Sequence, residues 1–156
     1  MEIKNQATDW TKASEVELIY RSKVKASERP RIRQSKDAFA LLIQHWDLNK
    51  IELLEEFKVI FLNQANKVLG IFNVSSGGIT GTVADPRLIF SAALKASACN
   101  IMLAHSHPSG NLQPSRADEE LTSKLKSAGQ FLDIRVLDHL IVSRDHYYSF
   151  ADEGLI

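Results

Sequence analysis

Two histidines and one aspartate between positions 105 and 118 have the types and the spacing of a metal site. His105 and His107 follow an apolar run at residues 101–104 that is typical of a buried strand. Side chains two residues apart in a strand point to the same face, so the two imidazoles can bind one ion. A loop with two prolines and a glycine at residues 108–114 then returns Asp118 as an oxygen ligand. Two histidines and one carboxylate leave the fourth tetrahedral position to water, as in catalytic zinc sites.

The two histidines, Asp118 and the nearby Ser115 each have an ordinary structural explanation as well. Ser115 is a good helix N-cap, and Asp118 three residues later fits a capping box at the same helix start. A histidine at a strand end is usually a polar residue at the rim of a sheet. The joint pattern is more specific than any of its members: His-x-His, seven residues, then Ser-x-x-Asp. The combination therefore favours metal chemistry.

Three helices are expected around this pattern. They begin at residues that cap helix N-termini well, Ser35, Asp85 and Ser115, and a proline follows Asp85 at the first helical position. The first helix is expected to end near Asp47. The third is expected to stop at Gly129, because glycine is common in the C-cap position.

Short apolar runs predict the strands. They are residues 57–62, 68–74, 101–104, 134–137, 140–142 and 147–150. A turn-like segment separates the first two, which predicts a hairpin. Helices that alternate with strands predict one α/β domain with a mixed sheet covered by helices on both faces.

An N-terminal arm is expected at residues 1–34, ahead of the domain at residues 35–156. Apolar and polar residues alternate at residues 16–20 and predict a short strand. Residues 21–36 carry seven basic side chains and one acid, Glu28. Such a segment can bind the phosphates of nucleic acid, although it is more often a solvated arm.

The composition is that of an ordinary globular protein. The 156 residues are 44% hydrophobic, and 19 basic and 19 acidic side chains give a net charge of zero. No apolar run approaches the roughly 18 residues of a membrane span, and the polar N-terminus does not resemble a secretory signal. The single cysteine, Cys99, fits a reducing compartment. A cytoplasmic location with no membrane partner is expected.

The His-x-His and Ser-x-x-Asp spacing resembles the metal motif of the JAMM (MPN-plus) metallopeptidase superfamily. The segments His-Ser-His-Pro-Ser-Gly, Gln-Pro-Ser-Arg-Ala-Asp and Leu-Asp-His-Leu, at residues 105–110, 113–118 and 137–140, narrow this to the RadC family of JAB-domain proteins. The resemblance covers roughly residues 53–156. It implies a three-layer α/β/α, cytidine-deaminase-like JAB/MPN fold and a bound zinc ion (Zn²⁺).

The resemblance also implies a glutamate on an early strand that acts as general acid and base. Glu55 and Glu56 are the candidates, and Glu55 is favoured because it shares a strand face with Phe57. Zinc lowers the pKa of water towards about 7, and the glutamate takes up the proton during attack on an amide carbonyl. Ser115 corresponds to the serine that stabilises the developing oxyanion.

Three further features bear on this resemblance. Asp138 and His139 are candidates for hydrogen-bond partners of the metal ligands, but a polar pair at a strand end is the favoured interpretation. Ser106 stands where RadC proteins usually have asparagine, and little effect is expected because it faces away from the ligands. RadC proteins typically carry an N-terminal helix-hairpin-helix region, but the residues before Leu53 show no glycine-rich hairpin signature. A short form, like those on mobile elements, is therefore expected, and the family's link to DNA repair is weakened.

Three functions compete on this basis. The favoured one is a zinc-dependent amide-bond hydrolase, a metallopeptidase or isopeptidase that acts on a peptide or protein. The second is a catalytically silent, zinc-containing accessory or DNA-binding module with its basic arm on phosphates. The third is a non-haem iron oxygenase, because two histidines and a carboxylate also suit that chemistry. The motif serine and the upstream glutamate fit hydrolysis better.

Overall fold

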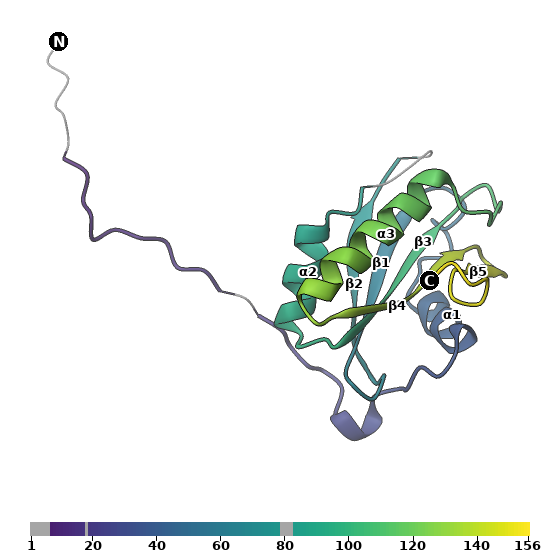
Figure 1. Ribbon diagram of the computed structural model, residues 1–156, viewed down its shortest axis with the longest axis horizontal. Helices are drawn as coiled ribbons and strands as arrows, with labels where there is room; N and C mark the ends of the chain where they lie inside the picture. The colour runs from purple at the N-terminus through teal and green to yellow at the C-terminus, as the bar shows by residue number, and fades with distance from the viewer. Residues whose placement is uncertain (1–6, 18, 79–82) are drawn as a thin grey trace, which may run out of the picture.

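The computed structural model describes residues 7–17, 19–78 and 83–156. They form a five-stranded mixed sheet and the helices that flank it (Figure 1). In chain order the elements are η1 (Ala26–Glu28), α1 (Ser35–Gln44), β1 (Glu56–Leu62), β2 (Val68–Ser76), α2 (Pro86–Lys95), β3 (Asn100–Ser106), α3 (Arg116–Phe131), β4 (Arg135–Val142) and β5 (Tyr147–Ser149). The strand order is β2-β1-β3-β4-β5, with β3 and β4 parallel and the other neighbours antiparallel.

Helices cover both faces of the sheet, which gives three layers (Figure 1). On one face, α2 and α3 share a core with Phe57 of β1 and Leu103 of β3. On the other face, α1 shares a core with Ile60 and Met102 of the same two strands. Side chains alternate along each strand, so each strand contributes to both cores. The predicted α/β/α class with a mixed sheet is confirmed. Among the described residues, no helix has the length and apolar character needed to span a bilayer.

The strand predicted at residues 16–20 is wrong in its described part. The described residues 16, 17, 19 and 20 have no strand pairing, and Val16 is 86% exposed. An alternating pattern becomes a strand only where a neighbouring strand satisfies its backbone groups, and in the described structure this segment forms no backbone pairing with the edge strand β2, although the Tyr20 side chain reaches it. Leu18 and residues 1–6 of the predicted arm lie outside the described residues.

The later part of the N-terminal segment packs against the β1–β2 hairpin. The hydroxyl of Tyr20 donates to the Leu69 carbonyl on β2 over 2.5 Å. Arg31 forms an isolated antiparallel bridge with Lys67, and Ile32 beside it is buried in the core under α1. The segment that leads into α1 is thus attached to the domain through backbone pairing and apolar burial.

Helix α1 differs from its predicted bounds at both ends. Gln34 rather than Ser35 is the N-cap, because the Asp37 carboxylate accepts the backbone N–H of Gln34 over 3.2 Å. The helix ends at Gln44. It does not reach Asp47, whose side chain accepts a backbone N–H two residues further on and so forms a turn.

The junction between α3 and β4 also differs from the prediction. Helix α3 continues through Gly129 to Phe131, and Asp133 has the positive φ of 54° that follows the helix end. The two short strands predicted next are one strand, β4. The polar residues Asp138 and His139 do not interrupt it, because both are buried and hydrogen-bonded within the sheet.

Gly129 is required by close packing at this junction. A Cβ there would lie 2.3 Å from the Ile134 carbonyl oxygen and 3.5 Å from the Phe90 ring. We expect Gly129→Ala to lower the free energy of unfolding by about 1–3 kcal/mol, although alanine favours helix. Urea denaturation measures this change. Gly70→Ala is the control, because its Cβ would meet no atom within 4 Å. Equal losses in both variants would contradict the packing explanation.

Candidate metal centre

The end of β3 carries the two histidines. His105 lies within the strand, is 1% exposed and pairs across the sheet with Phe57 of β1. The two rings stack with centroids 5.9 Å apart and planes 3° apart. His107 follows the strand, and its backbone N–H donates to the Val142 carbonyl at the end of β4 over 3.2 Å. Pairing on both sides of β3 therefore fixes the position of both imidazoles.

The first turn of α3 carries the carboxylate. Asp118 forms the predicted capping box with Ser115: its Oδ2 accepts the Ser115 backbone N–H over 2.7 Å, and the Ser115 hydroxyl accepts the Asp118 N–H over 3.2 Å. The same carboxylate faces the histidines. The capping role and a ligand role are therefore compatible in one side chain, and the cap orients the carboxylate.

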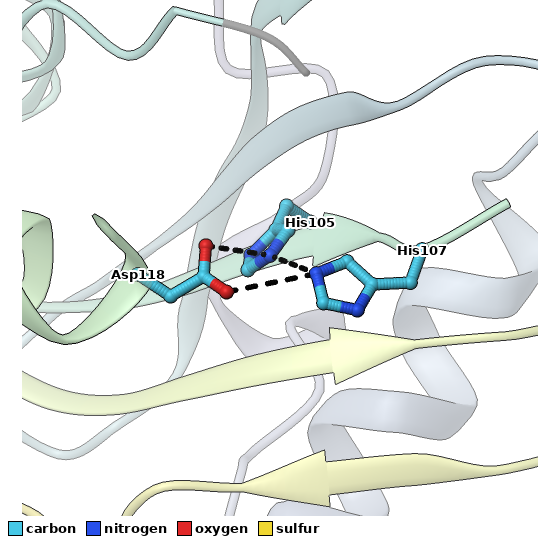
Figure 2. A group of neighbouring side chains, drawn as sticks. All are labelled: His105, His107 and Asp118. Atoms are coloured by element: carbon cyan, nitrogen blue, oxygen red, sulfur yellow. Dashed lines mark hydrogen bonds and ion pairs between the residues drawn. The ribbon is translucent and has the colours of Figure 1, made fainter. Parts of the chain in front are cut away.

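Three potential ligand atoms converge on one point (Figure 2). The Nε2 atoms of His105 and His107 are 2.9 Å apart. Asp118 Oδ1 lies 3.2 Å from His105 Nε2, and Asp118 Oδ2 lies 3.6 Å from His107 Nε2. Ligand atoms bound tetrahedrally at about 2.0–2.1 Å are about 3.3 Å from one another. The three separations bracket that value, so these residues fit a zinc ion.

The hydrogen bond behind His107 sets its tautomer. His107 Nδ1 is 2.6 Å from the Asn111 carbonyl oxygen, which can only accept. The proton of the neutral ring is therefore on Nδ1, and Nε2 has a free lone pair. That lone pair faces His105 and Asp118, as metal binding requires.

The charges at the centre depend on one another. Burial on its own would raise the pKa of Asp118, but the neighbouring rings of His105 and His107, which donate to the carboxylate when they are protonated, outweigh burial and hold the pKa well below its ordinary value. In the same way, the hydrogen bond that a protonated His107 ring makes to Asp118 raises the pKa of His107 against the effect of burial, and the charge of Glu55 acts in the same direction. Asp118 is thus ionised, and Glu55 is near enough to affect the site electrostatically.

Glu55 and Glu56 differ in their surroundings. Glu55 lies just before β1, with its carbonyl accepting the Gly77 N–H over 2.8 Å, and alternation gives it the face of Phe57. Glu56 has the opposite face, where its carboxylate lies 4.0 Å from the Lys58 ammonium and accepts the Ser76 hydroxyl over 3.4 Å. Glu55 is therefore the glutamate on the side of the histidines.

Ser106 holds the backbone around Glu55. Its hydroxyl donates to the Leu54 carbonyl over 3.1 Å and accepts the Glu56 backbone N–H over 3.0 Å. The side chain faces away from the histidines, as predicted. The sequence did not indicate that it ties the two residues flanking Glu55 to the end of β3, and this contact helps to position Glu55.

Ser115 is exposed at the start of α3 beside the centre. Its hydroxyl oxygen accepts the Asp118 N–H, which leaves the hydroxyl hydrogen to donate to a ligand. A donor on the rim of a metal site has the chemistry of an oxyanion stabiliser.

His139 and Thr122 contact the centre. The sequence pattern favours His139 as half of a polar pair at a strand end, which is wrong, because His139 is fully buried inside β4; the pattern gives no role to Thr122. Its Nε2 is 2.8 Å from His105 Nδ1, and its Nδ1 is 2.6 Å from the Thr122 hydroxyl. Burial lowers the pKa of His139 well below its ordinary value. Helical spacing could have identified Thr122 from the sequence, since it lies four residues after Asp118 and therefore on the same face of the helix.

Asp138 has a separate structural role on the opposite face of β4. Its carboxylate accepts the Ser149 hydroxyl over 2.6 Å and the Ala151 N–H over 2.9 Å. Burial raises the pKa of Asp138 against these hydrogen bonds. It therefore anchors the C-terminal segment.

Known proteins that are similar to this chain provide evidence independent of the site geometry. A family model described as RadC-like JAB domain matches residues 32–155. The chain is 45% identical over 131 residues to a UPF0758 protein of Flavobacterium johnsoniae, which covers 80% of this chain and 53% of that protein. It is 44% identical over 102 residues to the UPF0758 protein YfjY of Escherichia coli K12, covering 65% and 64%. A UPF0758 protein of Porphyromonas gingivalis is 47% identical over 103 residues, covering 65% and 45%. The chain thus spans about half the length of most of these relatives.

Proposed function

Because this chain belongs to the RadC-like JAB domain family, as its motif predicts, we propose that it is a zinc-dependent hydrolase of peptide or isopeptide bonds. One observation carries the proposal: the Nε2 atoms of His105 and His107 and the carboxylate of Asp118 face one another at separations close to those of tetrahedral zinc ligands. A site with three protein ligands leaves one position open, which distinguishes catalytic zinc sites from closed structural ones.

The chain's own residues divide the chemistry between them. Zinc in such a site lowers the pKa of water and polarises a carbonyl group. Glu55 accepts the proton from the attacking water and passes it to the nitrogen of the leaving amine as the C–N bond breaks. The Ser115 hydroxyl donates to the carbonyl oxygen while negative charge builds there. Asp118 is ionised and would partly neutralise the charge of a bound ion.

We expect purified chain to contain one zinc ion per molecule and to cleave some members of a peptide and ubiquitin-like-conjugate library. Elemental analysis measures the metal, and mass spectrometry of the library measures cleavage. A chelator should abolish cleavage, and added Zn²⁺ should restore it.

Other outcomes separate the competing functions. Bound iron with oxygen consumption would support an oxygenase. Bound zinc without cleavage of any library member, together with DNA binding that weakens as salt increases, would support an accessory module.

A further inference from the structure

A chain of hydrogen bonds leads from the back of His105 to helix α3. His105 Nδ1 is 2.8 Å from His139 Nε2. His139 Nδ1 is 2.6 Å from the Thr122 hydroxyl, which donates to the Asp118 carbonyl over 2.6 Å. This series of hydrogen bonds begins at His105, one candidate ligand, and ends on the backbone carbonyl of Asp118, another candidate ligand. Its direction decides which nitrogen of His105 carries the proton.

The Asp118 carbonyl decides which atom donates in each hydrogen bond of the series. The Asp118 carbonyl has no hydrogen to donate, so the single hydroxyl hydrogen of Thr122 points to it. Two polar atoms 2.6 Å apart need a hydrogen between them where no ion can lie between them, and the contact of Thr122 with His139 is on the far side of His105 from the candidate metal position. Between Thr122 and His139 that hydrogen must come from His139 Nδ1, and the Thr122 oxygen accepts it.

The surroundings of His139 carry this direction through to His105. The His139 ring is fully buried, stacks on Phe150 at a centroid distance of 4.8 Å and lies 5.6 Å from the Phe57 ring. An apolar enclosure of this kind favours the neutral ring, which has one N–H. Since that hydrogen is on Nδ1, His139 Nε2 accepts, and His105 Nδ1 donates to it.

We propose that Thr122 and His139 are positioning residues that hold His105 in the tautomer with its proton on Nδ1, so that Nε2 is free to bind the metal. The consequence for metal affinity rests on the proposed zinc site, whereas the tautomer is a property of the metal-free chain. In the opposite tautomer the Nε2–H would point at the ion and donate to Asp118, so binding would first require that proton to move.

Two substitutions at Thr122 form a matched pair. Thr122→Val keeps the branched shape and removes the hydroxyl, whereas Thr122→Ser keeps the hydroxyl and removes a methyl group. Without the hydroxyl, His139 Nδ1 has no acceptor, so the proton can move to Nε2 and reverse the hydrogen bond to His105. A role in packing alone would make both variants behave alike or would harm Thr122→Ser.

The tautomers are measured by long-range ¹H–¹⁵N correlation spectra of the metal-free chain with ¹⁵N-labelled histidine, at one fixed pH. We expect His105 and His139 of the wild type to carry their protons on Nδ1. Thr122→Val should populate the Nε2–H form of both rings, and Thr122→Ser should match the wild type. A wild-type His105 with its proton on Nε2 would overturn the proposal, even if Thr122→Val does not fold.

Zinc affinity, measured by chelator competition, provides the second readout. We expect Thr122→Val to weaken zinc binding by about 10- to 100-fold and Thr122→Ser to stay within a few-fold of the wild type. Equal affinities of all three folded proteins would overturn the proposed effect on the metal. If the wild type binds no zinc, the proposed function fails, while the spectra still decide the tautomer of His105.

Discussion

Glu55→Gln should retain zinc and lose hydrolysis by at least about 10²- to 10⁴-fold, the usual cost of removing a general base. The amide has nearly the size of the carboxylate but cannot accept a proton from water at neutral pH. Glu55 is not one of the residues whose potential ligand atoms converge, His105, His107 and Asp118, so its substitution leaves the ligands intact. The loss is measured as kcat/KM on a substrate from the cleavage screen, with zinc content determined on the same preparation.

Glu56→Gln is the matched control. Glu56 is adjacent in sequence and chemically identical, but it lies on the opposite face beside Lys58 and Ser76. We expect its activity to stay within a few-fold of the wild type. An inactive Glu56→Gln with a fully active Glu55→Gln would reverse the assignment of the two residues. Full activity of both variants would show that no glutamate assists the reaction.

His107→Ala should lose the zinc ion while the domain stays folded. The imidazole supplies one of three ligand atoms, so its removal leaves two and should produce a much larger loss of affinity than the Thr122 substitution. The ring lies beyond the end of β3 and outside both apolar cores, so the fold does not depend on it. Elemental analysis after gel filtration measures the zinc.

Thermal unfolding with and without zinc separates the fold from the metal. A ligand that binds only the folded state at 100 times its Kd stabilises it by about 2.7 kcal/mol. We expect zinc to raise the Tm of the wild type and of His146→Ala, whose exposed histidine lies in the turn after β4. Zinc should leave the Tm of His107→Ala unchanged. Equal zinc content in His107→Ala and the wild type would exclude His107 as a ligand.

The sequence by itself determined the elements around the site and the proximity of its three potential ligands. Asp85 caps α2 through the Arg87 N–H, and the Ser115 hydroxyl caps α3, because capping is an interaction within three or four residues. His105, His107 and Asp118 lie within fourteen positions of one another, on one strand, one loop and one helix start. Local spacing and a short connection are enough to bring such residues together.

Only the tertiary structure decided which residues surround these three. The face of Glu55 depends on the pairing of β1 with β3, which aligns Phe57 with His105, 48 positions later in the sequence. His139 reaches His105 because β4 lies parallel to β3, and the sequence pattern divided β4 into two strands. The strand predicted in the arm failed for the same reason. Its alternation was local, whereas a strand needs a partner, and the cost of an unpaired backbone depends on what the rest of the chain places beside it.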